Sequence, residues 1–132
     1  MRRSALKRKT WIRQRRKTRR RSARGRDPDY MILVRKLPCV VRAIVPQVIH
    51  ETTCYGEVQA DHAGQRPFGT KADDRTCIPM CRAHHHERSD HAGAFLQITR
   101  PNLREWLDKA IAHTQTQIAA LAKGAGHLMA LT

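Results

Sequence analysis

Apolar positions toward the end of the chain predict a long amphipathic helix. Over residues 100–123 they recur at three- and four-residue steps, which is the spacing of one face of an α-helix. Thr99 is a suitable N-cap, and Gly124 marks the expected C-terminal end. Such a face favours packing against the rest of the domain over binding a separate partner. It consists of Leu103, Trp106, Leu107, Ala110, Ile111, Ile118 and Leu121.

Two elements are predicted near the start of the folded part. Asp27 and Pro28 suit the N-cap and the first position of a short helix, which should end at Leu37 because a proline follows. The β-branched stretch over residues 39–49 then predicts an extended segment, interrupted at Pro46.

The middle of the chain predicts two short strands followed by a helix. Residues 57–62 and 76–80 have strand character, and a loop rich in glycine, proline and charged residues joins them. From Cys81 the pattern turns helical. Short strands set among helices predict a small α+β domain.

Charge separates the first residues from everything that follows. The 132-residue chain holds 26 basic and 11 acidic residues, a net charge of +15, and residues 1–26 contain 14 of the basic residues and no acidic one. We expect this segment to be a disordered cationic arm that binds a polyanion, nucleic acid first and an anionic membrane surface second. An organelle transit peptide is the alternative. The expected phosphate contacts are Arg13, Arg15, Arg16, Lys17, Arg19, Arg20 and Arg21, with Lys71 from the loop.

The distribution of apolar residues also bears on location. No run of 18 apolar residues occurs, so a membrane-spanning helix is not expected. The basic start is not followed by the apolar stretch of a secretory signal, so we expect a protein that stays in the cytoplasm.

Cysteine, histidine and aspartate residues indicate a metal site. Four cysteines without an export signal favour metal binding over disulfides. Asp61 and His62 end the first predicted strand, and His84, His85 and His86 enter the helix after the second. A carboxylate and an imidazole can hold one divalent ion, while a further imidazole takes a proton from water.

This interpretation places a condition on the first strand. We expect Asp61 to bind the metal and its neighbour His62 to act as the base. Because adjacent strand residues point to opposite sides, both can join one site only if the strand twists or bulges there.

The stretch CYGEVQADHAGQRPFGTKADDRTCIPMCRAHHHERSDHAGAF resembles the HNH (ββα-metal) endonucleases. It is closest to phage-type members, which read Cys, Glu-x-x-(Asp/His)-His, Gly-x-Lys-x-x-Asp and Pro-Leu-Cys-x-x-His-His. The resemblance covers about residues 27–95. It implies a small ββα-metal fold over residues 27–98, with a short N-terminal helix, preceded by the arm and followed by a packed C-terminal helix over 99–132.

Catalytic roles follow from the resemblance residue by residue. His62 matches the general base and Asp61 the first metal ligand. Asp74 matches the residue that braces the loop through backbone hydrogen bonds. His85 matches the first metal ligand on the helix.

The next ligand of the family falls one helical turn later, and this chain departs from the pattern there. Position 89 is a serine, which is a poor ligand. His91 is the first substitute and His86 the second, and water can complete the shell, since Mg²⁺ keeps several waters.

The resemblance also implies a structural zinc. Its ligands would be Cys39, Cys54, Cys81 and His84, with a wider first spacing than the family uses. The alternative is that cysteines such as Cys39 and Cys77 are small buried hydrophobic residues.

Together these features predict a metal-dependent HNH endonuclease that hydrolyses DNA phosphodiester bonds. The expected cofactors are a catalytic Mg²⁺, Mn²⁺, Ni²⁺ or Zn²⁺ ion and a structural zinc, with no small-molecule cofactor and no membrane partner. A recombination or packaging protein is a candidate partner, in a bacterial host cell if the protein is phage-encoded. The alternative is a non-catalytic zinc-binding nucleic-acid-binding protein, and an RNA-associated protein comes last.

Overall fold

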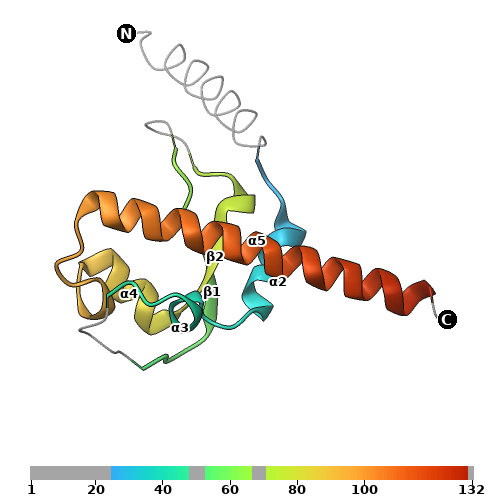
Figure 1. Ribbon diagram of the computed structural model, residues 1–132, viewed down its shortest axis with the longest axis horizontal. Helices are drawn as coiled ribbons and strands as arrows, with labels where there is room; N and C mark the ends of the chain where they lie inside the picture. Colours follow the sequence, from blue (N-terminus) through green and yellow to red (C-terminus); the bar gives the residue numbers. More distant parts are fainter. Residues whose placement is uncertain (1–24, 48–52, 67–70, 131–132) are drawn as a thin grey trace, which may run out of the picture.

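The computed structural model describes residues 25–47, 53–66 and 71–130, without the side chains of residues 126–130. Most of the predicted arm, including its seven named basic residues, lies outside this part. The described chain is a small α+β protein with a two-stranded sheet and a long C-terminal helix, an arrangement compatible with a ββα fold (Figure 1). The elements are α2 (Pro28–Lys36), α3 (Val40–Ala43), β1 (Val58–His62), η1 (Asp74–Thr76), β2 (Cys77–Cys81), α4 (Arg82–Asp90), η2 (Gly93–Phe95) and α5 (Arg100–Ala130).

Strands β1 and β2 form an antiparallel hairpin whose register places His62 opposite Cys77 and Val58 opposite Cys81. Each strand lies within one residue of its predicted bounds. All five residues of β2 are buried, whereas β1 is mostly half-buried. The hairpin therefore has one strand inside the molecule and one strand near the surface, where polar side chains can act.

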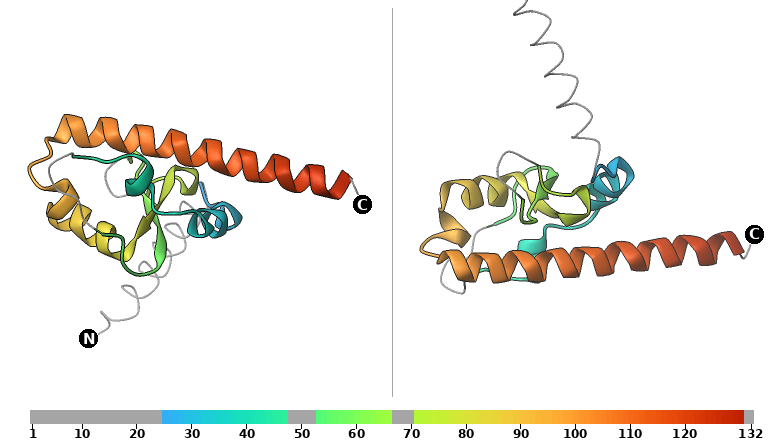
Figure 2. Two further views of the ribbon diagram at one scale, coloured as in Figure 1. Left: turned by 60° about the horizontal axis from the view of Figure 1, so that its bottom comes forward. Right: turned by 90° about the horizontal axis from the view of Figure 1, so that it is seen from above.

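Helix α5 crosses the hairpin and covers its main core (Figure 2). Trp106 packs edge-to-face on Phe95 with ring centroids 5.1 Å apart, and its indole N–H donates to the Ile44 carbonyl at 2.9 Å. Thr99 caps the helix by accepting from the Asn102 N–H at 3.4 Å. The predicted packing face is confirmed as far as Ile118, but Leu121 is 48% exposed. The C-terminal end of α5 extends past the rest of the described chain (Figure 1).

Helix α2 packs on the other side of the hairpin through a second apolar cluster. The predicted helix is confirmed: Asp27 caps it by accepting from the Tyr30 N–H at 3.1 Å, and Leu37 is its C-cap. Val34 and Leu37 pack against Cys77 of β2 and Ile118 of α5. This packing places the start of α2 beside the hairpin end that carries His62.

Two expectations about element types and ends are wrong. Residues 40–43 form a helical turn instead of extended chain, because tertiary packing that buries Val40 and Val41 overrides their β-branched preference. Residues 48 and 49 lie outside the described part. The long helix also continues beyond Gly124 to Ala130. The residues after Gly124 are mostly good helix formers, so one glycine does not end it.

Among the described residues, no helix is both long and apolar enough to cross a membrane.

Candidate functional site

Three cysteines and one histidine from distant parts of the chain come together at the start of α4. Cys39 precedes α3, Cys54 lies in the segment before β1, and Cys81 ends β2. Cys81 is also the N-cap of α4, where its sulfur accepts from the His84 N–H at 3.5 Å. The ligand atoms of all four residues lie within 4.8 Å of one another, so the four predicted zinc ligands are brought together.

The distances in this cluster suit a tetrahedral zinc ion. The Sγ atoms of Cys39, Cys54 and Cys81 lie 3.5, 3.5 and 3.0 Å from His84 Nδ1. Zinc bonds of about 2.3 Å to sulfur and about 2.0 Å to nitrogen, at tetrahedral angles, give a separation of about 3.5 Å. His84 and Cys81 are 1% and 2% exposed, so the position is closed to solvent. The cluster could hold a metal such as zinc.

Electrostatics give a further reason to expect a cation there. Burial, and then the negative charge of Cys39 and Cys81, raises the pKa of the Cys54 thiol to about 12. Burial likewise raises the pKa of Cys39. Despite its burial, hydrogen bonds lower the pKa of Cys81, so this thiol ionises first and the other two resist joining it. A metal ion removes that penalty because it binds thiolates.

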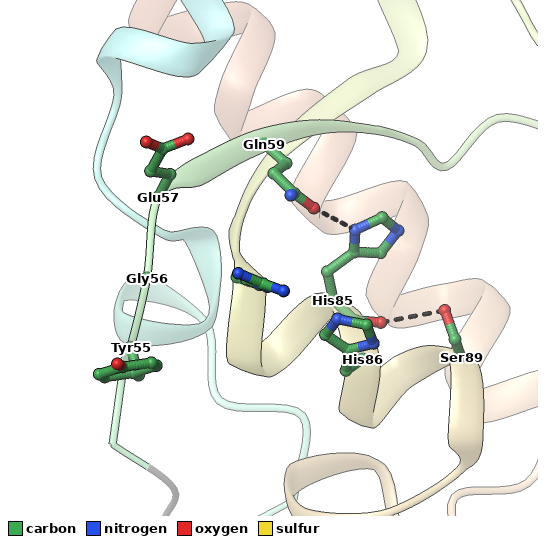
Figure 3. Close-up of a pocket in the computed structure, with 8 residues that line it drawn as sticks. Tyr55, Gly56, Glu57, Gln59, His85, His86 and Ser89 are labelled. Atoms are coloured by element: carbon green, nitrogen blue, oxygen red, sulfur yellow. Dashed lines mark hydrogen bonds between the residues drawn. The ribbon is translucent and has the colours of Figure 1, made fainter.

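A second, more open pair of ligand atoms lies between β1 and α4. Asp61 Oδ1 is 3.6 Å from His85 Nε2, close to the roughly 3–3.5 Å that two ligands of one ion keep. His85 Nδ1 lies 2.6 Å from Gln59 Oε1 (Figure 3). Since that amide oxygen can only accept, Nδ1 carries a proton, which leaves Nε2 as the nitrogen that a metal ion would use.

His62 makes a separate pair with Asp74. Its Nε2 is 2.8 Å from Asp74 Oδ1, and the other oxygen of Asp74 accepts from the Asp27 N–H at 2.8 Å. The hydrogen bond with His62, together with the Asp27 N–H, holds the pKa of the Asp74 carboxyl below its usual value. Asp74 therefore stays ionised and orients the His62 ring, while its backbone bond reaches the start of α2.

Asp61 and His62 point to opposite sides of β1. The β1–β2 ladder keeps a continuous register through Asp61 and His62, so no bulge brings the two side chains to one side of the strand. Asp61 contacts α4 and His62 contacts η1. The structure therefore places the predicted ligand and the predicted base in two pairs that flank the end of one strand.

The third metal ligand expected from the sequence is not found beside Asp61. Within the described residues, no other His, Cys, Asp or Glu ligand atom lies within 4.8 Å of both Asp61 and His85. His91 caps the end of α4 in an αL conformation and is exposed, as is His86. The Ser89 hydroxyl donates to the His85 carbonyl at 3.0 Å. The pair thus offers two protein ligands and leaves other positions to water or substrate.

An open hollow of about 710 Å³ borders His85 (Figure 3). Gln59 and Glu57 line it from the strand side, and His85 and His86 from α4. Lys71 is exposed in the loop between the strands.

His62 and Asp74 have another neighbour in the buried thiol of Cys77. The three ligand atoms lie within 4.8 Å of one another. Burial, followed by the charges of Asp74 and Asp61, raises the pKa of Cys77 to about 12. Cys77 is fully buried in the second apolar cluster, as the hydrophobic alternative for this cysteine expected.

Two residues of the site were not predicted from the sequence. Gln59 lies two positions before Asp61, on the same side of β1, and Arg88 lies one helical turn after His85 and pairs with Asp61. Period-2 spacing along a strand and three-residue spacing along a helix are the signals that could have found them.

No family model matches this chain, and the comparisons with curated proteins and with solved structures return no match. Function is therefore inferred from the geometry of these groups.

Proposed function

We propose that the protein is a metal-dependent nuclease of the HNH type that hydrolyses DNA phosphodiester bonds. The observation that carries this proposal is the arrangement at the end of β1. Asp61 faces His85 as a two-ligand pair, and the next residue, His62, is oriented by an ionised carboxylate. Metal-assisted phosphodiester hydrolysis requires an oriented imidazole and a bound metal ion. Because Asp61 and His62 point to opposite sides of β1, the scissile phosphate would have to lie across the end of this strand to reach both.

Each side chain has a defined part in this proposal. Asp61 and His85 would hold a divalent ion, which when bound supplies positive charge to the scissile phosphate and its leaving oxygen. Asp74 accepts the proton on His62 Nε2, so Nδ1 is left to take a proton from water. The ionised Asp74 then stabilises the imidazolium that forms.

DNA as the substrate is supported by charge. The first 26 residues carry 14 basic side chains and no acidic one, and a cationic segment binds the phosphate backbone without reading sequence. If the arm contacts about 6–10 phosphates, affinity should fall by about 10³–10⁵ between 50 and 200 mM salt.

Plasmid nicking tests the proposal. Zinc-loaded protein, stripped of other divalent ions, should nick supercoiled plasmid only after Mg²⁺, Mn²⁺ or Ni²⁺ is added. His62→Ala should lower the nicking rate by about 10²–10⁴ while melting temperature and DNA affinity stay close to wild type. Nicking that is independent of metal, or that survives in His62→Ala, would show that Asp61, His85 and His62 do not catalyse the cleavage.

The second candidate is a non-catalytic zinc-binding nucleic-acid-binding protein, and the cluster of Cys39, Cys54, Cys81 and His84 favours it. In that case the metal serves folding alone and the arm does the binding. This candidate predicts retained zinc and DNA binding with no nicking in any divalent ion, and no effect of His62→Ala.

A further inference from the structure

Arg88 binds one of the two carboxylate oxygens of Asp61, a candidate metal ligand. It follows His85 by three residues on α4, so both side chains reach the same face of the helix. Arg88 Nη2 forms an ion pair with Asp61 Oδ2, while Asp61 Oδ1 faces His85 Nε2. The side chains of Arg88 and Asp61 are 19% and 8% exposed, so water screens this pair only weakly.

The ion pair changes the charge that a metal ion would meet. Asp61 contributes one negative charge and Arg88 cancels it, while His85 can ligate a metal only as a neutral imidazole and so adds no negative charge. The described part of the chain places no further acidic ligand near both Asp61 and His85. A divalent cation at Oδ1 and Nε2 would therefore find two ligand atoms and no uncompensated negative charge.

A phosphate group supplies both the missing ligand atoms and the missing negative charge. Its oxygens are hard ligands for a divalent ion, and its negative charge compensates the ion and the guanidinium together. Arginine suits this position because its several donors can serve a carboxylate and a phosphate at once.

We propose that Arg88 makes divalent-metal binding at Asp61 and His85 dependent on a nucleic-acid phosphate. The guanidinium restricts Asp61 to one free oxygen and neutralises it, so the free protein binds the metal weakly and the complex with nucleic acid binds it strongly. The inference rests on the proposed function, because it takes Asp61 and His85 as the metal ligands. It assigns Arg88 as a positioning residue that couples two ligands of the site.

Metal affinity in the presence and absence of DNA tests this coupling without measuring activity. Mn²⁺ would be titrated into the zinc-loaded full chain by calorimetry, with and without a saturating short DNA duplex, after subtraction of Mn²⁺ binding to DNA alone. A His62→Ala background keeps the duplex intact. The duplex should raise Mn²⁺ affinity by about tenfold or more, and Mn²⁺ should raise duplex affinity by the same factor.

Replacing Arg88 should remove the coupling. Arg88→Met should raise the Mn²⁺ affinity of the free protein by about tenfold and reduce the effect of the duplex to about twofold or less. Arg88→Lys keeps the charge and should keep most of the coupling. Arg42→Met is the matched control, because it removes a positive charge from an exposed position of α3 that does not line the hollow beside His85, and it should behave like the parent.

The outcomes separate this inference from the proposed function. If Arg88→Met changes neither free affinity nor coupling, while Asp61→Asn abolishes Mn²⁺ binding, the metal site stands and the role of Arg88 is wrong. If Asp61→Asn leaves Mn²⁺ binding unchanged both with and without DNA, the proposed function is wrong, and the inference that rests on it is wrong as well. Circular dichroism would confirm folding, and Arg88→Gln, which retains a donor to Asp61, replaces Arg88→Met if that variant does not fold.

Discussion

Neighbouring residues on α4, His84 and His85, belong to two different kinds of site. His84 points into a closed cluster with three thiols and is 1% exposed. The side chain of His85 is 36% exposed and faces one carboxylate beside an open hollow. A rotation of about 100° per residue is enough to send the two rings to opposite surroundings.

The two candidate sites differ in how many protein ligands they offer, and that number distinguishes a structural metal site from a catalytic one. Structural zinc sites use four protein ligands and no open position, whereas catalytic sites leave positions for water or substrate. The His84 cluster meets the first description with Cys39, Cys54 and Cys81. The His85 pair meets the second, since the described residues supply only Asp61 beside it. One helix therefore attaches a candidate reaction site directly to the group that would hold the fold together.

The largest effect should come from opening the closed cluster. Zinc binding contributes about 10–16 kcal/mol to folding in small zinc domains, comparable with the total stability of about 5–15 kcal/mol of a typical domain. Cys54→Ala should therefore abolish the cooperative thermal transition and the bound zinc, as measured by calorimetry and elemental analysis. Cys54 is only half-buried, so lost packing would not explain such a result.

The matched control is Cys77→Ala. Cys77 is more deeply buried than Cys54 but lies outside the four-residue cluster. Cys77→Ala should lower the free energy of unfolding by about 1 kcal/mol and leave the zinc bound. Equal destabilisation by the two substitutions, with zinc retained in both, would show that the cysteines act through packing alone.

The next effect concerns the open pair. His85→Ala removes one of two protein ligands, so nicking should fall by more than the factor of about 10–100 that follows loss of a group supporting a ligand. The melting temperature should change little because His85 is partly exposed. His113→Ala is the control, since His113 is also partly exposed but lies on α5 and does not line the hollow beside His85. Comparable losses in both variants would argue against a specific role for the Asp61–His85 pair.

A smaller, pH-dependent effect is expected at Asp74. Asp74→Asn should slow nicking by about 10–100-fold, because the ring of His62 loses the carboxylate that orients it. It should also destabilise the fold by about 1–3 kcal/mol through the weakened bonds to His62 and Asp27. Asp73→Asn is the control, because Asp73 is exposed and caps only η1.

The sign of the pH dependence follows from the direction of the Asp74 shift. Its hydrogen bond with His62 lowers the folded-state pKa, so its ionised form stabilises the protein above the ordinary carboxyl pKa of about 3.9. That contribution is lost as pH falls through the folded-state pKa. The difference in melting temperature between wild type and Asp74→Asn should therefore shrink below about pH 4. A difference that stays constant into acid would mean that Asp74 is not ionised in the fold.

The sequence could predict those parts of the site that depend on spacing and ligand chemistry. Asp61 meets His85 because the hairpin places the end of β1 beside α4, the helix that follows β2. The same packing brings three cysteines to His84 at the start of that helix. Their residue types are uncommon enough in such a short window that the sequence alone indicates metal binding.

Other features depend on tertiary contacts that a one-dimensional pattern does not contain. Val40 and Val41 favour strands by type, yet burial against α5 and β2 holds them in a helical turn. Arg88 is one of 26 basic residues, and only its position beside Asp61 distinguishes it. Residue type and spacing indicate His91 as a third ligand, whereas the structure places a cation against Asp61.

The smallest effect lies outside both sites, at Gly124. The long helix passes through this residue, and a Cβ added there would meet nothing within 4 Å. Gly124→Ala should therefore stabilise the protein by about 0.5–1 kcal/mol through reduced chain entropy in the unfolded state, a shift of a few degrees in melting temperature. Ala125→Gly should shift it by a similar amount in the opposite direction. Zinc content and Mn²⁺ affinity should not change in either variant, because neither residue lies near the ligands. If Gly124→Ala instead destabilises the protein, the glycine adopts the left-handed cap that its sequence position predicted, and the helix ends there.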